Sequence, residues 1–328
     1  MKTLILSHSD IERLLGVDEC IEAMAAALSD LARGHVYLPQ RMVLTPPGAA
    51  GFMGLMPAYT SGDEPGFGLK AVCVFPANAA KGKDIHQGAV ALYSPETGEI
   101  QALMNASAIT AKRTAAVSAL ATRTLARDDA RVVTIIGAGV QGEAHLEAIA
   151  RVRDIREARV ADRDAQRAQD FARRIGPSHA FPVVGAGSVE EALKGADIVM
   201  TVTTSSEPVL RREWLAEGAH INAVGACAPQ AREIDSATMA AAKIFVDRRE
   251  ATFAESGDYL IAAAEGAVGP DSIRAELGEV LIGAAPGRTS SEEITLFEAL
   301  GLAVEDLACA RLLYRVAQQA RAGTWVDF

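Results

Sequence analysis

Hydrophobic and polar positions follow one pattern before about residue 130 and a different pattern after it. The first part mixes helical spacing of apolar residues with short apolar runs that Gly and Pro interrupt. A hairpin turn is expected at 94–99, where Ser, Pro and Gly separate two strand-like runs. The predicted helices of this part are 17–33 and 109–126, and the predicted strands are 69–75, 89–93 and 100–104.

The second part begins with residues 132–136, a continuous apolar run that is typical of a strand buried on both faces. Helical and strand-like segments then alternate, which predicts an α/β fold with a doubly wound parallel sheet of the Rossmann type. The tail, 294–321, is predicted to be helical. The further strands predicted here are 157–161, 181–184, 197–202, 219–224 and 243–246, and the helices are 142–151, 166–175 and 189–194.

Composition narrows the class of protein. A chain of 328 residues with 49% hydrophobic and 23% charged residues is that of a folded protein with about two domains. Its formal net charge of −10 argues against a nucleic-acid partner. The four cysteines form no Cys-x-x-Cys pair, so no disulfide framework or metal site is expected. No run of 18 apolar residues or signal peptide is visible, so we expect a cytoplasmic protein without membrane contact.

A glycine-rich loop follows the strand predicted at 132–136 and precedes a predicted helix. Its spacing is G-x-G-x-x-G, the pattern that lets a dinucleotide pyrophosphate approach the backbone and the amino-terminal end of a helix. The pattern carries weight because strand, loop and helix occur in the required order. The candidate cofactor-binding residues of the loop are Gly137, Gly139, Val140, Gln141 and Gly142.

An acidic residue stands where such a fold places the ribose contact. Asp162 comes 20 residues after Gly142, at the end of the next predicted strand, where a carboxylate would accept a bond from a ribose 2′-hydroxyl. This favours NAD(H), although the adjacent Arg163 could meet the 2′-phosphate of NADP(H). Thr203 follows the strand predicted at 197–202 and is a further candidate cofactor contact, because ligands bind at the carboxyl ends of parallel strands.

Several segments together resemble the ornithine cyclodeaminase/mu-crystallin family. Nearly the whole chain is covered, and the segments occur in the family's order. They are residues 51–58, 68–70, 109–119 with its Lys-Arg-Thr-Ala-Ala run, the glycine loop, 221–226 and 294–306.

The resemblance implies a homodimer that acts on a small imino or amino acid with an α-carboxylate beside a carbon bonded to nitrogen. It also implies that the carboxyl-terminal helix returns to the amino-terminal domain. We therefore expect an α+β substrate-binding and dimerisation domain of residues 1–122 and 303–328. A Rossmann domain of residues 123–302 would be inserted within it.

The family's carboxylate-binding residues carry over to Arg41, Lys70 and Arg113. A guanidinium can bind a carboxylate with two parallel bonds, and a lysine adds a point charge. Lys70 and Arg113 are also the candidate catalytic residues. By the same resemblance, Arg113, Thr114 and His86 lie at the cofactor.

Two positions depart from the pattern of the cyclodeaminases. Those enzymes carry an aspartate where this chain has Cys227, and a carboxylate before the Leu-Met-Pro segment, where it has Gly54. Both acids that would meet a second amino group are therefore missing. Cys227 is a candidate substrate neighbour, and we interpret it as a small packing residue rather than as a nucleophile.

These observations predict an NAD(P)H-dependent reductase of a small α-imino acid, in the first place a cyclic ketimine such as 1-pyrroline-2-carboxylate, which would become L-proline. An acyclic amino-acid dehydrogenase or an iminosuccinate-type reductase is the first alternative. Ornithine cyclodeaminase is the next, weakened by Gly54 and Cys227. The last is a non-catalytic binding protein similar to mu-crystallin.

Overall fold

The computed structural model describes residues 2–62 and 64–328. The chain divides into two compact units: residues 1–113 together with 301–328, and residues 114–300. The boundaries expected from the sequence are 122/123 and 302/303, whereas this division falls at 113/114 and 300/301. The first junction falls inside helix α3, Ala106–Leu125, and no local signal in the sequence marks a point within a continuous helix.

The first unit is built on a mixed eight-stranded sheet. The order is β16-β1-β7-β6-β5-β4-β2, with β3 paired to β4; β1 and β7 run parallel, and the other pairs are antiparallel. Its strands are β1 (Lys2–Leu6), β2 (Val36–Tyr37), β3 (Met42–Leu44), β4 (Phe52–Thr60), β5 (Gly66–Val74), β6 (His86–Tyr93), β7 (Ile100–Asn105) and β16 (Thr324–Asp327). Its helices are α1 (His8–Leu14), α2 (Val17–Ala32), the start of α3, and α11 (Ala303–Ala320).

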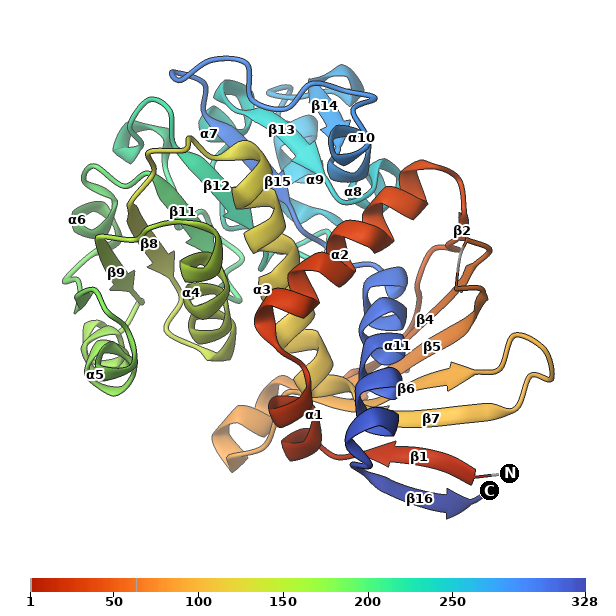
Figure 1. The fold of residues 1–328 in the computed structure, drawn as a ribbon. Coiled ribbons are helices and arrows are strands. Elements are labelled where there is room, and N and C mark those ends of the chain that lie inside the picture. Colours follow the sequence, from red (N-terminus) through yellow and green to blue (C-terminus); the bar gives the residue numbers. More distant parts are fainter. Residues whose placement is uncertain (1, 63) are drawn as a thin grey trace. The chain divides into compact units, whose positions relative to one another are not determined.

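Helix α11 packs against α2 and against strands β4, β5 and β6, so it covers one face of this sheet (Figure 1). The approach is close, because a Cβ added at Gly68 on β5 would lie 2.8 Å from Leu307 Cδ1 on α11. Side chains alternate between the two faces of a strand, and the residues of β5 that are buried include Gly68, Lys70 and Val72. Lys70 therefore lies on the face of the sheet that α11 covers.

The second unit holds an all-parallel sheet in the order β10-β9-β8-β11-β12-β15-β13-β14. Strands β8, β11, β12 and β15 are buried along their whole length, as a continuous apolar run predicts. The strands are β8 (Val132–Ile136), β9 (Glu157–Ala161), β10 (Val183–Gly185), β11 (Ile198–Thr201), β12 (His220–Ala223), β13 (Lys243–Val246), β14 (Ile273–Glu276) and β15 (Thr295–Glu298).

Helices connect these parallel strands, so the doubly wound α/β fold predicted from the alternation is confirmed. They are α4 (Val140–Val152), α5 (Ala165–Ile175), α6 (Val189–Leu193), α7 (Ser236–Ala241), α8 (Arg249–Glu255), α9 (Gly257–Ala264) and α10 (Leu277–Leu281), in addition to the second part of α3. Within the described residues, no helix has the length and apolar character needed to cross a membrane.

The single helix predicted at 294–321 is wrong in its first part. Residues Thr295–Glu298 form strand β15, which lies between β12 and β13, and α11 begins only at Ala303. Gly301, with φ of +79°, breaks the chain direction between them. The sequence pattern also does not predict strand β4, because Gly54 and Pro57 interrupt its alternation.

Candidate functional site

Two of the cations expected to bind a carboxylate are buried together in the first unit. Lys70 is 4% exposed and Arg113 is 5% exposed. Lys70 Nζ lies 3.3 Å and Arg113 Nε lies 3.5 Å from the same atom, Oδ1 of Asp306. Arg113 Nη1 also lies 2.8 Å from Oε2 of Glu305. Buried cations of this kind need partners, and the two adjacent acids of α11 provide them.

The third predicted cation, Arg41, reaches the same neighbourhood through Gly301. Arg41 Nη2 donates a 2.7 Å hydrogen bond to the carbonyl oxygen of Gly301. A Cβ added at Gly301 would overlap the guanidinium of Arg113. The glycine is therefore needed for two reasons, since it permits the positive φ and leaves the space that Arg113 occupies. We define Arg41, Lys70, Arg113, Glu305 and Asp306 as the cation cluster.

Burial alters the protonation of two groups in this unit. It lowers the pKa of Lys70 to about 8, although the nearby Asp306 carboxylate works in the opposite direction. Burial, with added repulsion from Lys70 and Arg113, lowers the pKa of His86 to about 4. His86, the first residue of β6, is consequently neutral at pH 7. Lys70 is mostly protonated there and sits close to the point at which it releases its proton.

Sequence reasoning does not identify three residues in and around the cation cluster: Glu305, Asp306 and Gly301. They lie in the tail segment 294–306 that carries part of the family resemblance. Two adjacent acids near the start of a largely apolar helix are a sequence signal for buried carboxylates, which need cationic partners. Glu305 and Asp306 are indeed almost completely buried. Their partners, however, lie 192 and 236 positions earlier in the chain.

The glycine loop of the second unit has the form that a dinucleotide requires. Gly137 has φ of +118°, and a Cβ there would lie 2.8 Å from the carbonyl oxygen of Val202. A Cβ at Gly142 would lie 2.5 Å from the carbonyl oxygen of Gly137, whereas Gly139 faces open space. Among the residues that the structure describes, no side chain caps the start of α4, so its first N–H groups can meet a phosphate. Val140, in the first turn, is 70% exposed.

Asp162 directly follows β9 and is tied to the glycine loop. Its Oδ2 accepts a 3.0 Å hydrogen bond from Ala138 N, and its Oδ1 accepts one of 3.2 Å from Asp164 N. Arg167 Nη1 lies 4.0 Å from Oδ1, while Arg163 is exposed. The acid is thus held at the strand end, next to two arginines on the solvent side.

The remaining predicted residues lie on or near the elements expected for them. Thr203 follows β11, and its backbone N–H donates a 2.6 Å hydrogen bond to Glu233 Oε1. Cys227 is an exposed residue whose Sγ lies 3.1 Å from the carbonyl oxygen of Val224.

Thr114 is buried in α3. His145, a residue without a predicted role, is buried between Gln141 O at 2.7 Å and Ser118 Oγ at 3.0 Å.

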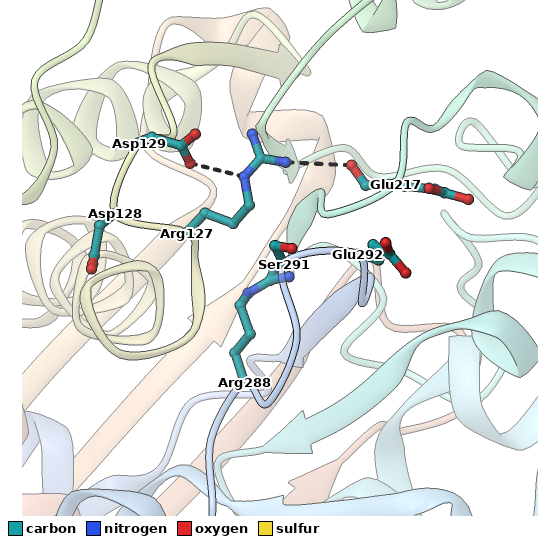
Figure 2. A pocket seen from close by; sticks show the side chains of 7 residues that line it. All are labelled: Arg127, Asp128, Asp129, Glu217, Arg288, Ser291 and Glu292. Atoms are coloured by element: carbon teal, nitrogen blue, oxygen red, sulfur yellow. Dashed lines mark hydrogen bonds and ion pairs between the residues drawn. The ribbon is translucent and has the colours of Figure 1, made fainter.

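An open cavity of about 620 Å³ lies elsewhere in the second unit. Figure 2 shows two arginines and several acids around it. The lining residues are Arg127, Asp128, Asp129, Glu217, Arg288, Ser291 and Glu292. Most of these precede β8, β12 and β15, so the cavity is at the amino-terminal edge of the parallel sheet. The glycine loop is at the carboxyl edge, which is where dinucleotides bind such sheets. This cavity is therefore separate from the predicted cofactor site.

The parallel sheet, the glycine loop and the acid after the second strand define a Rossmann-type dinucleotide-binding fold. The family model of the ornithine cyclodeaminase/mu-crystallin family matches residues 1–321. The chain belongs to this family, as its segments predicted.

Individual relatives are similar to this chain in sequence or structure along nearly its whole length. The ketimine reductase mu-crystallin of Mus musculus is 41% identical over 294 residues, which are 90% of each protein. The structure of Thermococcus litoralis Δ1-pyrroline-2-carboxylate reductase in complex with NADH and L-proline has a TM-score of 0.96. It is 38% identical and covers 99% of this chain and 100% of that one. An archaeal alanine dehydrogenase dimer with bound NAD has a TM-score of 0.93 and is 36% identical, with 100% of both chains covered.

Proposed function

We propose that the protein is an NAD(H)-dependent oxidoreductase that reduces a small α-imino acid, with a cyclic ketimine such as 1-pyrroline-2-carboxylate as first substrate and L-proline as product. The observation that carries this proposal is the buried cation cluster, in which Lys70 and Arg113 share one carboxylate oxygen of Asp306. A cluster of this kind suits a small substrate carboxylate. The reductase relatives named above, one of them bound to NADH and L-proline, support the same reaction.

Arg41 and Arg113 would bind the substrate carboxylate. Both are guanidinium groups, which can give two parallel charge-assisted bonds and so fix the plane of the substrate as well as its position. The contact of Arg41 with Gly301 and of Arg113 with Glu305 restrains both side chains before the substrate arrives. Orientation of this kind lowers the barrier because the entropy of alignment is lost on binding.

Lys70 is the candidate proton donor to the imine nitrogen. Its pKa of about 8 allows it to be an ammonium at pH 7 and yet to lose a proton readily. Transfer of that proton would turn the imine into an iminium ion and leave Lys70 neutral, with Asp306 beside it. The bound dinucleotide supplies the hydride that completes the reduction. Cys227, small and uncharged, would leave room for a compact substrate near the strand ends.

The residues present fit a dinucleotide at the glycine loop. Gly139 leaves open space for the pyrophosphate, and the start of α4 offers N–H groups to it. Asp162 would bind the ribose hydroxyls and so favour NAD(H), with NADP(H) as a second option through Arg163. The proposed cofactor-binding residues are His86, Arg113, Thr114, Gly137, Gly139, Val140, Gln141, Gly142, Asp162, Arg163 and Thr203.

The proposed assembly is a homodimer. Several large apolar side chains are exposed on strands β2 to β5 of the first unit, and Tyr37 reaches 72% exposure. These exposed side chains are Tyr37, Met42, Val43, Leu44, Phe52, Met53 and Phe67. Exposed apolar side chains gathered on neighbouring strands favour a protein contact, and the archaeal alanine dehydrogenase is a dimer. The cytoplasmic location expected from the sequence stays a prediction.

A second candidate is reduction of an acyclic imine, as in an alanine dehydrogenase or an iminosuccinate-type reductase. The similarity to the archaeal alanine dehydrogenase favours it. The cation cluster serves both candidates, because both substrates carry an α-carboxylate. Ornithine cyclodeamination is less supported, since Gly54 on β4 and Cys227 replace two acids.

The deciding experiment is a substrate panel with each reduced cofactor. NADH and NADPH are each mixed with 1-pyrroline-2-carboxylate, a six-membered cyclic ketimine, iminosuccinate, and pyruvate plus ammonia, and loss of the reduced cofactor's absorbance is followed. We expect the fastest turnover with a cyclic ketimine and NADH. An ammonia-dependent reaction with pyruvate would instead identify the acyclic dehydrogenase. If no imino acid is turned over but NADH still binds, the protein is a non-catalytic binder and the proposal is wrong.

A further inference from the structure

Glu233 is a completely buried carboxylate in the second unit that the reaction described above does not use. Its Oε1 accepts a 2.6 Å hydrogen bond from Thr203 N, and its Oε2 accepts one of 2.7 Å from Gly225 N. Both oxygens are thus committed to backbone N–H groups. Thr203 comes two residues after β11, and Gly225 comes two residues after β12.

These two N–H groups lie at the edge of the sheet where the cofactor is expected. β11 and β12 are adjacent parallel strands, and β11 is also the neighbour of β8, which leads into the glycine loop. The order β9-β8-β11 places the switch point of the doubly wound sheet between β8 and β11. Dinucleotides lie across this point, with one half over the β8–β9 side and the other over β11 and β12. The turns that Glu233 holds belong to the second half.

The glycine loop itself rests on one of these turns. A Cβ added at Gly137 would lie 2.8 Å from Val202 O and 3.2 Å from Thr203 Cγ2. A shift of the turn at Thr203 would therefore displace Gly137, the first glycine of the loop. On the other side, a Cβ at Gly225 would lie 2.5 Å from Glu233 Oε2, so the second turn fits closely around the carboxylate.

A second buried acid, Asp258, holds the backbone of Glu233 in place. Asp258, in the first turn of α9, accepts hydrogen bonds from Glu233 N at 2.8 Å and from Ile234 N at 2.9 Å through its Oδ1. The carbonyl oxygen of Glu233 accepts bonds from Val209 N and Leu210 N. The backbone of Glu233 is thus held on both sides, and its side chain has a defined origin from which to reach the two turns.

We propose that Glu233 is a positioning residue of the cofactor site, whose carboxylate fixes the turns after β11 and β12 in the arrangement that binds the nicotinamide half of NADH. The inference rests on the proposed NAD(H) binding. Glu233 acts through Thr203 and Gly225.

The ionisation of Glu233 gives the proposal a signature. Only the ionised carboxylate accepts both N–H groups well, because a protonated one turns an oxygen into a donor. Burial, with repulsion from Asp258, raises the pKa of Glu233 to about 7. The other charged groups around this site are Glu298 of β15, bonded to Ser256 Oγ, and Arg232, the residue before Glu233. NADH affinity should therefore fall as the pH is lowered through about 7.

The test is direct titration of NADH fluorescence with the full-length protein and two variants. In Glu233→Gln, one carboxylate oxygen is replaced by an NH2 group, which cannot accept the backbone N–H that it faces, and the Kd for NADH should rise about tenfold. The matched control is Glu276→Gln, which changes a buried carboxylate that accepts a bond from Arg249 N at the end of edge strand β14. Its Kd should stay within about twofold of the wild type, because only a general loss of stability would affect both variants alike.

Two further readouts separate positioning from a merely structural role. The rise of the NADH Kd below about pH 7 should be present in the wild type and absent in Glu233→Gln. The KM for the imino acid should change little, since the cation cluster is not altered. If Glu233→Gln does not fold, Glu233→Asp keeps the charge on a side chain one methylene group shorter, and it should weaken NADH binding because it cannot reach both N–H groups.

The outcomes distinguish this inference from the proposed function. A wild-type protein that binds no NADH overturns the proposed function and, with it, the inference. A wild type that binds NADH, beside a Glu233→Gln variant with the same Kd and the same pH dependence, overturns the inference alone.

Discussion

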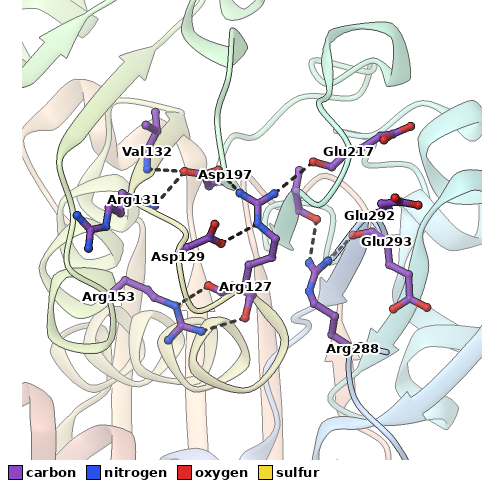
Figure 3. A network of polar contacts seen from close by, with 12 residues as sticks. Arg127, Asp129, Arg131, Val132, Arg153, Asp197, Glu217, Arg288, Glu292 and Glu293 are labelled. Atoms are coloured by element: carbon purple, nitrogen blue, oxygen red, sulfur yellow. Dashed lines mark hydrogen bonds and ion pairs between the residues drawn. The ribbon is translucent and has the colours of Figure 1, made fainter. Parts of the chain in front are cut away.

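Arginines of the two units meet different kinds of partner. In the second unit, Arg153 and Arg288 bond mainly to backbone carbonyls around the amino-terminal edge of the sheet, whereas Arg127 pairs with the carboxylates of Asp129 and Asp197 (Figure 3). Arg288 uses all three nitrogens in this way, with Nε donating to Leu125 O at 2.6 Å and Nη2 donating to Ala219 O and Thr295 Oγ1. Its Nη1 donates to Ser290 O and Glu293 O. In the first unit, Arg113 is paired with carboxylates, Glu305 and Asp306.

The partners of Arg153 and Arg288 differ from those of Arg113, the arginine for which we propose a substrate contact. Arg153 donates to the carbonyls of Thr122 and Ala126, near the end of α3, and so satisfies groups that a helix terminus leaves without partners. Such an arginine serves the fold by satisfying backbone acceptors. Arg113 instead stands in a group of three cations and two carboxylates, to which an anionic substrate would add the third negative charge. The cavity of Figure 2 does not mark the proposed substrate site, since it is lined by Arg127 and Arg288 and by no residue of the cation cluster.

The largest expected effect is on Arg113. Replacement by lysine keeps the charge and loses the planar pair of donors, so kcat/KM for the imino acid should fall about 100-fold, equivalent to about 3 kcal/mol of transition-state binding. The melting temperature should drop by only a few degrees, because Glu305 and Asp306 keep a cation nearby. Steady-state kinetics with NADH measures this, and an unchanged kcat/KM would remove Arg113 from the substrate site.

The matched substitution in the second unit should act on stability instead. In Arg288→Lys, hydrogen bonds to the carbonyls of Leu125 and Ala219 and to the hydroxyl of Thr295 are lost, at a cost of about 2 kcal/mol in the free energy of unfolding. Urea denaturation measures the loss. The kcat/KM should stay within about twofold of the wild type. A large loss of activity at full stability would mean that this edge of the sheet takes part in function.

The third prediction concerns the pH dependence of the reductive reaction. The pKa of Lys70 is lowered to about 8 by burial, so the ammonium form is complete well below that pH and is lost above it. If Lys70 donates the proton, kcat/KM should be level from about pH 6.5 to 7.5, at saturating NADH, and should fall about tenfold per pH unit well above 8. A Lys70→Met variant provides the control, since its residual activity should lack this step. A wild-type profile that is level to about pH 10 would exclude Lys70 as the donor.

The smallest expected effect is on the choice of cofactor. Asp162→Ser removes a carboxylate that would repel a 2′-phosphate, while Arg163 and Arg167 stay beside it. The KM for NADPH should fall about tenfold relative to that for NADH, a change of about 1.4 kcal/mol in preference. The ratio of the two kcat/KM values measures it. An unaltered ratio would mean that Asp162 serves the loop through Ala138 and does not touch the ribose.

Much of the second unit could be predicted because its signals are local. Strand β8 and strand β9 have the predicted bounds, since the first is a short apolar run and the second alternates charged and apolar residues, each between clear breaks. The glycine loop is equally local. Residues 294–298 are harder to predict, because a short apolar run followed by Gly301 fits the end of a strand as well as the start of a helix.

The site of the first unit could be predicted only in part. Arg41, Lys70 and Arg113 were identified through the family resemblance, which also covers the tail. That Asp306 joins Lys70 to Arg113 depends on the packing of α11 over β5, and a pattern in one sequence does not contain such a long-range contact. Glu233 illustrates the same limit, because nothing around it in the sequence indicates that its oxygens bond to Thr203 and Gly225.

Gly301 offers a way to compare this chain with its homologues. Its φ of +79° and the closeness of Arg113 mean that even one methyl group there would push the guanidinium aside. Such a change alters no charge and hardly alters hydropathy, so a comparison of chemical character would overlook it. A homologue that keeps all three cations but carries a side chain at this position should have lost substrate turnover while keeping its fold. We therefore expect the residue at this position to distinguish active from inactive enzymes among otherwise similar sequences.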